Sequence, residues 1–152
     1  MKTDLALIVL SVVAVSLFAA AEELCPKMFG AGMPFLLSSV LYFSSKRPLF
    51  VAVPFAIVAG AAEDAVSSLP FVTAMSFFAM AAFACALLKT GVALASVFFP
   101  AAFQLWLWIW EPSIGNGVFA RVLVSVPAGL FTAFAASAAL SFAERKGGLD
   151  AA

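Results

Sequence analysis

GAAEDAVSSLPF, residues 60–71, separates two long apolar runs, and its adjacent carboxylates decide how these runs fold. If Glu63 and Asp64 lay within one apolar helix, they would form a buried ionisable site, which in a membrane indicates transport or catalysis. The alternative is a turn between two helices at the membrane surface. The serines and the proline that follow Asp64 are typical of a turn and a helix start. The sequence therefore predicts a turn in which Asp64 or a serine caps the next helix.

The composition is that of an integral membrane protein. Of the 152 residues, 65% are hydrophobic and 11% are charged, and the mean hydropathy is +1.15. Soluble domains contain roughly 45–50% apolar and about 25% charged residues. The length suits one compact helical unit, so we expect residues 1–152 to form a single transmembrane domain.

Several function classes are disfavoured by what the chain lacks. Its net charge is zero and it has no basic tract, which gives no support for binding nucleic acid. It has no histidine, the commonest metal ligand and general base. Cys25 and Cys85 are far apart in sequence and at different expected depths, which disfavours a disulfide or a zinc site. We expect no enzymatic activity, no metal and no cofactor.

The apolar segments predict a compact bundle of six transmembrane helices. A span needs roughly 17–25 mostly apolar residues. The candidates are residues 5–21, 33–45, 48–62, 71–88, 91–110 and 118–142. The second is too short to cross a core of roughly 30 Å by itself, so we expect it to recruit residues 29–32 or to be shielded by its neighbours. Three spans carry a proline that should kink them: Pro54, Pro100 and Pro127.

The basic residues predict the orientation of the bundle. If both termini are cytoplasmic, the outer side carries only two of the eight basic residues, Lys27 and Arg121. The other six then lie inside: Lys2, Lys46, Arg47, Lys89, Arg145 and Lys146. This is the asymmetry of the positive-inside rule. The rival hypothesis is a cleaved signal peptide in residues 1–21, against which stands the long unbroken apolar run.

Small residues at four-residue intervals predict helix-packing faces, because in lipid they let backbones approach closely. One stripe lies in the third span and one in the sixth: Ala52, Ala56 and Gly60, then Ser125, Gly129, Ala133, Ser137 and Ser141. Packing within the bundle is the first interpretation of both stripes. Docking of a helix from a partner protein is the alternative, above all for the sixth span.

Trp106, Trp108 and Trp110 end the fifth span. Side chains two positions apart point in different directions on a helix, so the three rings do not form one face. Tryptophans at one depth on several faces are typical of interfacial anchors. The alternative is a ring-binding site, which Glu111 and Asn116 would help to line.

Residues 33–83 resemble the rod shape-determining protein MreD family of bacteria. In that family a proline precedes an aliphatic stretch ending in tyrosine, which Pro34 and Tyr42 match. A glycine then stands four residues before an acid, followed by a small-residue turn. Gly60 and Asp64 match this pattern, with Ser67 and Ser68 after them, whereas Glu63 is an addition to it.

The resemblance implies a small multi-pass protein of the bacterial inner membrane that has no chemistry of its own. It implies a scaffold of the cell-elongation machinery that holds a single-span partner of the MreC type. Through it the actin-like filament MreB would be coupled to peptidoglycan synthase and transpeptidase. The family is also similar in fold to the substrate-binding components of energy-coupling-factor vitamin transporters, which gives the alternative function. A third hypothesis is a six-helix membrane protein of another function.

Overall fold

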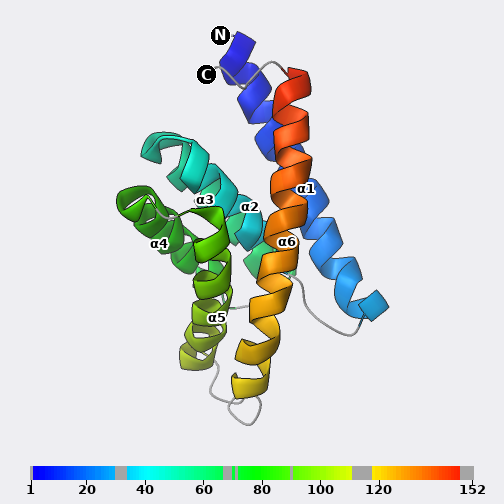
Figure 1. Ribbon diagram of the computed structural model, residues 1–152, viewed down its shortest axis with the longest axis vertical. Coiled ribbons are helices and arrows are strands. Elements are labelled where there is room, and N and C mark those ends of the chain that lie inside the picture. The colour runs from blue at the N-terminus through cyan, green and yellow to red at the C-terminus, as the bar shows by residue number, and fades with distance from the viewer. Residues whose placement is uncertain are drawn as a thin grey trace.

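The computed structural model describes residues 2–29, 34–66, 70, 72–89, 91–110 and 118–147. Within these residues the chain forms six α-helices and no strand (Figure 1). The helices are α1 (Lys2–Phe29), α2 (Phe35–Lys46), α3 (Leu49–Val66), α4 (Thr73–Leu88), α5 (Val92–Trp110) and α6 (Val118–Gly147). The predicted all-α class is confirmed, and the three prolines lie inside α3, α5 and α6 as expected.

Among the described residues, three helices are long and apolar enough to cross a membrane. They are α3, α5 and most of α6, over Phe119–Arg145. The apolar part of α1, Ile8–Ala21, and α4 are shorter. The chain is therefore a helical bundle whose three candidate spans suggest a multi-pass membrane protein. That all six helices span the membrane remains a prediction.

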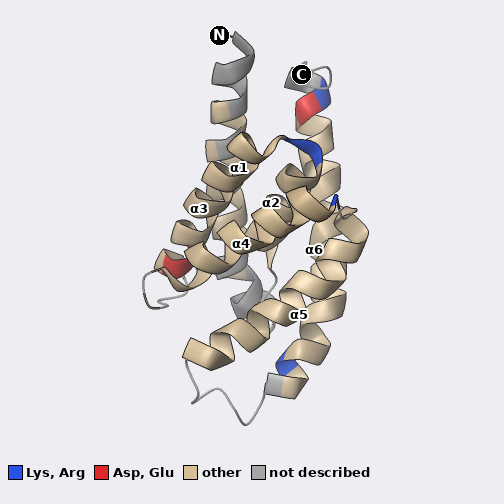
Figure 2. Ribbon diagram, turned by 90° about the vertical axis from the view of Figure 1, so that its left-hand side faces the viewer, with Lys and Arg blue, Asp and Glu red and all other residues tan. Residues whose placement is uncertain are grey.

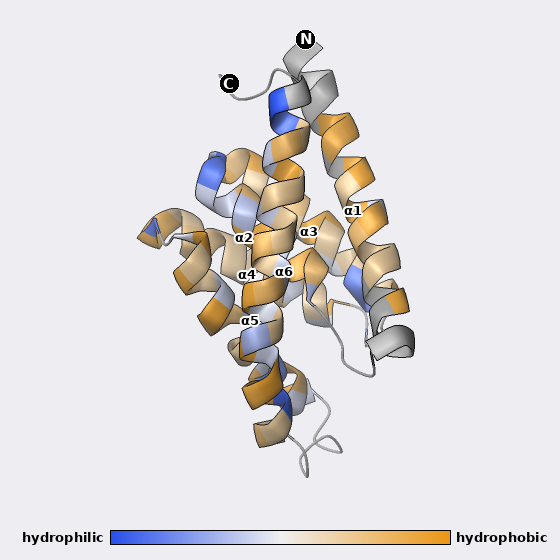
Figure 3. Cartoon of the chain, turned by 45° about the vertical axis from the view of Figure 1, so that its right-hand side comes forward, coloured by the Kyte–Doolittle hydropathy of each residue, from blue (hydrophilic) through white to orange (hydrophobic). Residues whose placement is uncertain are grey.

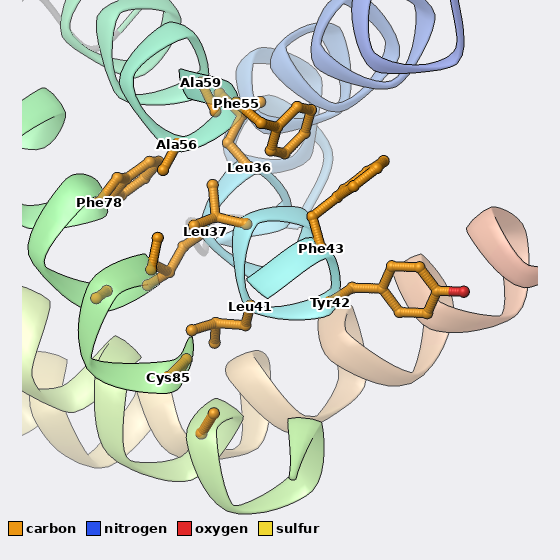
Figure 4. Packing of buried hydrophobic residues seen from close by; sticks show 14 of the residues in the cluster. Leu36, Leu37, Leu41, Tyr42, Phe43, Phe55, Ala56, Ala59, Phe78 and Cys85 are labelled. Carbon is orange, nitrogen blue, oxygen red and sulfur yellow. The ribbon is translucent and has the colours of Figure 1, made fainter. Parts of the chain in front are cut away.

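The short helix α2 lies at the centre of the bundle. Residues 36–44 are all buried, and α2 packs against each of the other five helices. Figure 4 shows its side chains pointing to different neighbours, with Leu37 and Leu41 toward α4 and Phe43 toward Phe55 of α3. Serines of α2 can be buried because their hydroxyls bond carbonyl oxygens of the same helix or, for Ser38, the Thr132 hydroxyl. The expected shielding of the second apolar segment is confirmed.

Four of the other helices form two antiparallel pairs around α2, α3 with α4 and α5 with α6, and α1 packs mainly against α2 and α3 (Figure 1). Their outer faces carry many exposed large apolar side chains. Figure 3 shows that hydrophobic residues occur along the helices of both pairs. Examples are Phe50, Leu94, Phe119, Leu123 and Phe134, each at least two-thirds exposed. Apolar surface of this extent is typical of contact with a membrane or with partner proteins.

The described charged residues form two groups along the long axis of the bundle, with most basic residues in the upper half of Figure 2 and the acids of α3 in the lower half. α1 begins, and α6 ends, at the same end of the molecule (Figure 1). We call this the basic end, defined by Lys46, Arg47, Lys89, Glu144 and Arg145. Glu63, Asp64 and Arg121 lie toward the opposite end. This separation matches the grouping predicted from the sequence, and the side that faces the cytoplasm stays a prediction.

Candidate functional site

Asp64 joins α3 to the first turn of α4. Its Oδ1 accepts a hydrogen bond from the amide of Ala74 at 2.7 Å, and its Oδ2 accepts one from the amide of Met75 at 3.3 Å. Amides in the first turn of a helix have no partner within the helix, so the carboxylate satisfies them and complements the dipole. The predicted cap is confirmed, and Asp64 is the capping residue.

The position of the acids differs from the prediction in one respect. The third apolar segment was expected to end at residue 62, with both carboxylates in the turn, but α3 continues to Val66. Asp64 therefore lies in the last turn of a helix and is buried, because it reaches sideways to α4 and its burial is compensated by two hydrogen bonds. Glu63 is half-buried.

Gly60 lies one helical turn before Asp64 and faces the same helix. A Cβ atom at Gly60 would lie 2.4 Å from the Cα of Met75 and 2.9 Å from the carbonyl oxygen of Ala74. Only glycine permits this approach of the α3 backbone to the start of α4. The four-residue spacing thus has a physical reason: Gly60 brings the helices together, and Asp64 caps the helix that has been brought close.

Trp106 belongs to the same corner. Its indole Nε1–H donates a hydrogen bond to the carbonyl oxygen of Thr73 at 2.9 Å, and its ring packs on Phe77, with the centroids 6.1 Å apart. Trp106 is therefore a half-buried packing residue that ties α5 to α4. Trp108 and Trp110 are 45% and 54% exposed, and their role as interfacial anchors stays a prediction.

A buried cluster of three polar side chains joins α2 to α6 at the basic end. The Tyr42 hydroxyl donates to Oε2 of Glu144 at 2.8 Å, and Nη2 of Arg47 donates to Oε1 of the same carboxylate at 2.8 Å. The side chains of Arg47 and Glu144 are each only 8% exposed. Figure 4 shows the Tyr42 ring turned away from the leucines of the core. Tyr42 was predicted from the sequence, but Glu144 was not. The one feature of the sequence that could have indicated Glu144 is that it is an acid next to basic residues at the end of a helix.

A second link between α2 and α6 lies in the middle of the bundle. The hydroxyl oxygens of Ser38 and Thr132 are 2.7 Å apart and both residues are buried. The Thr132 hydroxyl also lies 2.9 Å from the carbonyl oxygen of Ala128, one turn earlier in α6. Hydrogen bonds of this kind hold helices together where the surroundings offer no water.

The small-residue stripes pack largely within the bundle. In α3 the whole stripe of Ala52, Ala56 and Gly60 is buried. In α6 a Cβ at Gly129 would lie 2.5 Å from the carbonyl oxygen of Ser96 and 2.6 Å from Cγ of Pro100, so α5 crosses α6 there.

The α6 stripe is not buried along its whole length. Ser125, Gly129 and Ala133 are buried, whereas Ser137 and Ser141 are half-buried. A four-residue step turns about 40° around a helix, so a long stripe drifts off the face that a neighbour covers. The buried face of this half of α6 carries Ala136, Leu140 and Glu144 instead.

The last predicted positions to be placed are Pro34 and four polar residues of the loops. The Pro34 carbonyl accepts the amide of Ser38 at 3.0 Å, which makes Pro34 the start of α2. Ser67, Ser68, Glu111 and Asn116 lie outside the described residues. Within the part of the chain that the structure describes, no three acidic, histidine or cysteine side chains are grouped so as to hold a metal.

The arrangement as a whole is a set of polar links between helices. Asp64 and Trp106 fasten one end of the bundle, Ser38 and Thr132 its middle, and Glu144 the basic end. Comparison of the chain with protein-family models, with curated proteins and with solved structures gives no match.

Proposed function

We propose that the protein is a non-enzymatic scaffold subunit of the bacterial inner membrane, in the complex that elongates the peptidoglycan wall and sets cell shape. Its partners would be a single-span protein of the MreC type and, through it, the filament MreB and a peptidoglycan synthase and transpeptidase. In this proposal the bundle supplies a rigid apolar surface on which partner helices assemble.

The main support for the proposal is that the buried polar side chains bond other groups of the same protein. In a transporter or a membrane enzyme, polar groups at membrane depth face a substrate or an ion pathway. Here Asp64 bonds main-chain amides, Ser38 bonds Thr132, and Glu144 bonds a tyrosine and an arginine. These side chains hold helices in place, which is the chemistry that a scaffold needs.

The positions that carry the resemblance to the MreD family also have structural roles. Pro34 starts α2, Tyr42 links α2 to α6, Gly60 sets the approach of α3 to α4, and Asp64 caps α4. All four positions of the motif therefore stabilise the packing of the helices. This favours a structural function over a catalytic one. This agreement supports the family assignment within the proposal.

The packing narrows the surface on which a partner helix would dock. The α3 stripe and Gly129 are covered by helices of the same chain, so a partner there would have to displace α4 or α5. The second half of the α6 stripe is more open, since Ser137 and Ser141 are half-buried and Ala138 is exposed between them. We place the docking of the single-span partner on this half of α6.

Co-purification with a single-span partner of the MreC type tests the proposal. Ala138→Phe should reduce the recovered partner at least about fivefold, because a large side chain prevents close approach of a helix backbone. Ala93→Phe makes the same change at an exposed alanine of α5 and is the matched control. Thermal unfolding in detergent should be unchanged in both variants, since both sites are exposed.

Two outcomes would contradict the scaffold. One is a partner that never co-purifies with the unaltered protein, or that is lost equally with both variants. The other is a vitamin-type small molecule bound at near-stoichiometric level in the purified protein, detected by mass spectrometry, because this would favour the transporter component.

A further inference from the structure

A cleft of about 370 Å³ opens at the basic end of the bundle. One wall is the turn from α2 to α3, residues 44–49, and the other is the end of α4, including Cys85 and Lys89. Small-molecule sites have volumes of roughly 300–1,000 Å³. The cleft is therefore large enough for a compact polar group and too small for a whole lipid or a helix.

The cleft presents more positive than negative charge. Lys46, Arg47 and Lys89 line it. Arg47 is paired with Glu144, which balances one of the three charges. Lys46 and Lys89 are exposed, and within the described residues neither ammonium group is paired with a carboxylate. The start of α3 and the C-terminal ends of α2 and α4 all lie at the cleft, so the helix dipoles give no net preference for an anion and the attraction rests on the two lysines.

The rim of the cleft is apolar and exposed. Leu49 and Leu87 line the cleft and are 38% and 63% exposed, and their neighbours in sequence, Phe50 and Leu88, are 78% and 71% exposed. A soluble anion such as phosphate would gain nothing from these side chains. An anionic phospholipid would gain from both parts of the site, since its phosphate would face the lysines and its acyl chains would cover the leucines.

We propose that this cleft binds the headgroup of an anionic phospholipid, such as cardiolipin or phosphatidylglycerol. The ammonium groups of Lys46 and Lys89 contact the phosphate, and the acyl chains run along the exposed faces of α3 and α4. Basic pockets between transmembrane helices bind such headgroups, and lysines at helix ends extend toward the headgroup region. The proposal requires a membrane protein but does not depend on the scaffold function.

The test is lipid binding to the purified full chain in detergent, followed by native mass spectrometry and by thermal unfolding. Cardiolipin and phosphatidylglycerol should bind and raise the unfolding temperature, whereas phosphatidylcholine with the same acyl chains and inorganic phosphate should not. Lys46→Gln and Lys89→Gln should each weaken binding of the anionic lipids about fivefold, and the double variant about 25-fold. Arg145→Gln is the matched control, because Arg145 is exposed at the same end but does not line the cleft.

Four results would overturn the proposal. Unchanged affinity of the double variant would place the site elsewhere. Equal binding of phosphatidylcholine would show that only acyl chains are held, and an equal effect of inorganic phosphate would show a site for free anions. Should the double variant fail to fold, the unaltered protein still decides the matter, because affinity for the anionic lipids must fall as salt is raised. Affinity that is independent of salt would exclude the two lysines as the binding groups.

Discussion

The Oδ1 atom of Asp64 in α3 lies 2.7 Å from the main-chain nitrogen of Ala74 in α4 and accepts its hydrogen bond in the interior of the protein. The bond forms because Gly60, one turn earlier, lets the two helices approach to backbone contact. The corner between α3 and α4 therefore depends on a pair of residues with different tasks. Each task can be removed separately by substitution.

Asp64→Ala should lower the free energy of unfolding by about 2 kcal/mol, since loss of a cap costs about 0.5–2 kcal/mol and buried amides left unpaired add to it. Asp64→Asn keeps one side-chain acceptor and should lose less than half as much. Unfolding of both variants in detergent, followed by circular dichroism, measures the difference. Equal stability of Asp64→Ala and the unaltered protein would show that the cap contributes nothing.

Gly60→Ala should destabilise the bundle by about 1–3 kcal/mol, the usual cost of overpacking, because the new methyl group meets the backbone of Met75. Alanine is otherwise the better helix former by about 1 kcal/mol, so a net loss identifies the contact as the cause. Gly91→Ala is the control, since a Cβ there meets nothing within 4 Å. A loss of the same size in Gly91→Ala would show that the contact between Gly60 and Met75 is not the cause of the destabilisation.

The sequence was sufficient for the features that depend on composition along a continuous segment. The apolar runs of α5 and α6 predict helices because each run is long enough by itself, whereas the third run, residues 48–62, is short and α3 reaches 18 residues only by continuing to Val66. The capping role of Asp64 was predictable because its partner lies only ten residues away.

Features that depend on which distant segments meet were not predictable in this way. Tyr42 and Glu144 are 102 residues apart, and no local pattern pairs them. The α6 stripe was expected to be continuous, but its second half turns off the buried face because the helix repeat is 3.6 residues and not four. Trp106 was grouped with Trp108 by residue type, whereas its hydrogen bond to Thr73 depends on how α5 packs.

The Arg47–Glu144 pair predicts non-additive effects of substitution. Glu144→Met should cost about 3–5 kcal/mol of stability, because it leaves the guanidinium of Arg47 buried without its carboxylate. The double variant Arg47→Met with Glu144→Met should lose clearly less than the sum of the single losses, since no isolated charge remains. A double-mutant cycle on unfolding in detergent gives the coupling energy, and additive losses would show that the pair does not interact.

Trp106→Phe separates packing from interfacial anchoring. Phenylalanine keeps an aromatic ring near Phe77 but removes the N–H donor, so the Thr73 carbonyl loses its bond to α5. Hydrogen bonds between helices in membranes contribute about 0.6 kcal/mol on average, and loss of indole contact area adds to this. Trp108→Phe makes the same change on the exposed side of α5 and should leave the unfolding free energy unchanged while weakening partition into the interface. Only a residue that joins two helices should change the free energy of unfolding in detergent. If the two variants lose the same stability, Trp106 acts as an interfacial anchor and its bond to Thr73 does not stabilise the packing of α5 on α4.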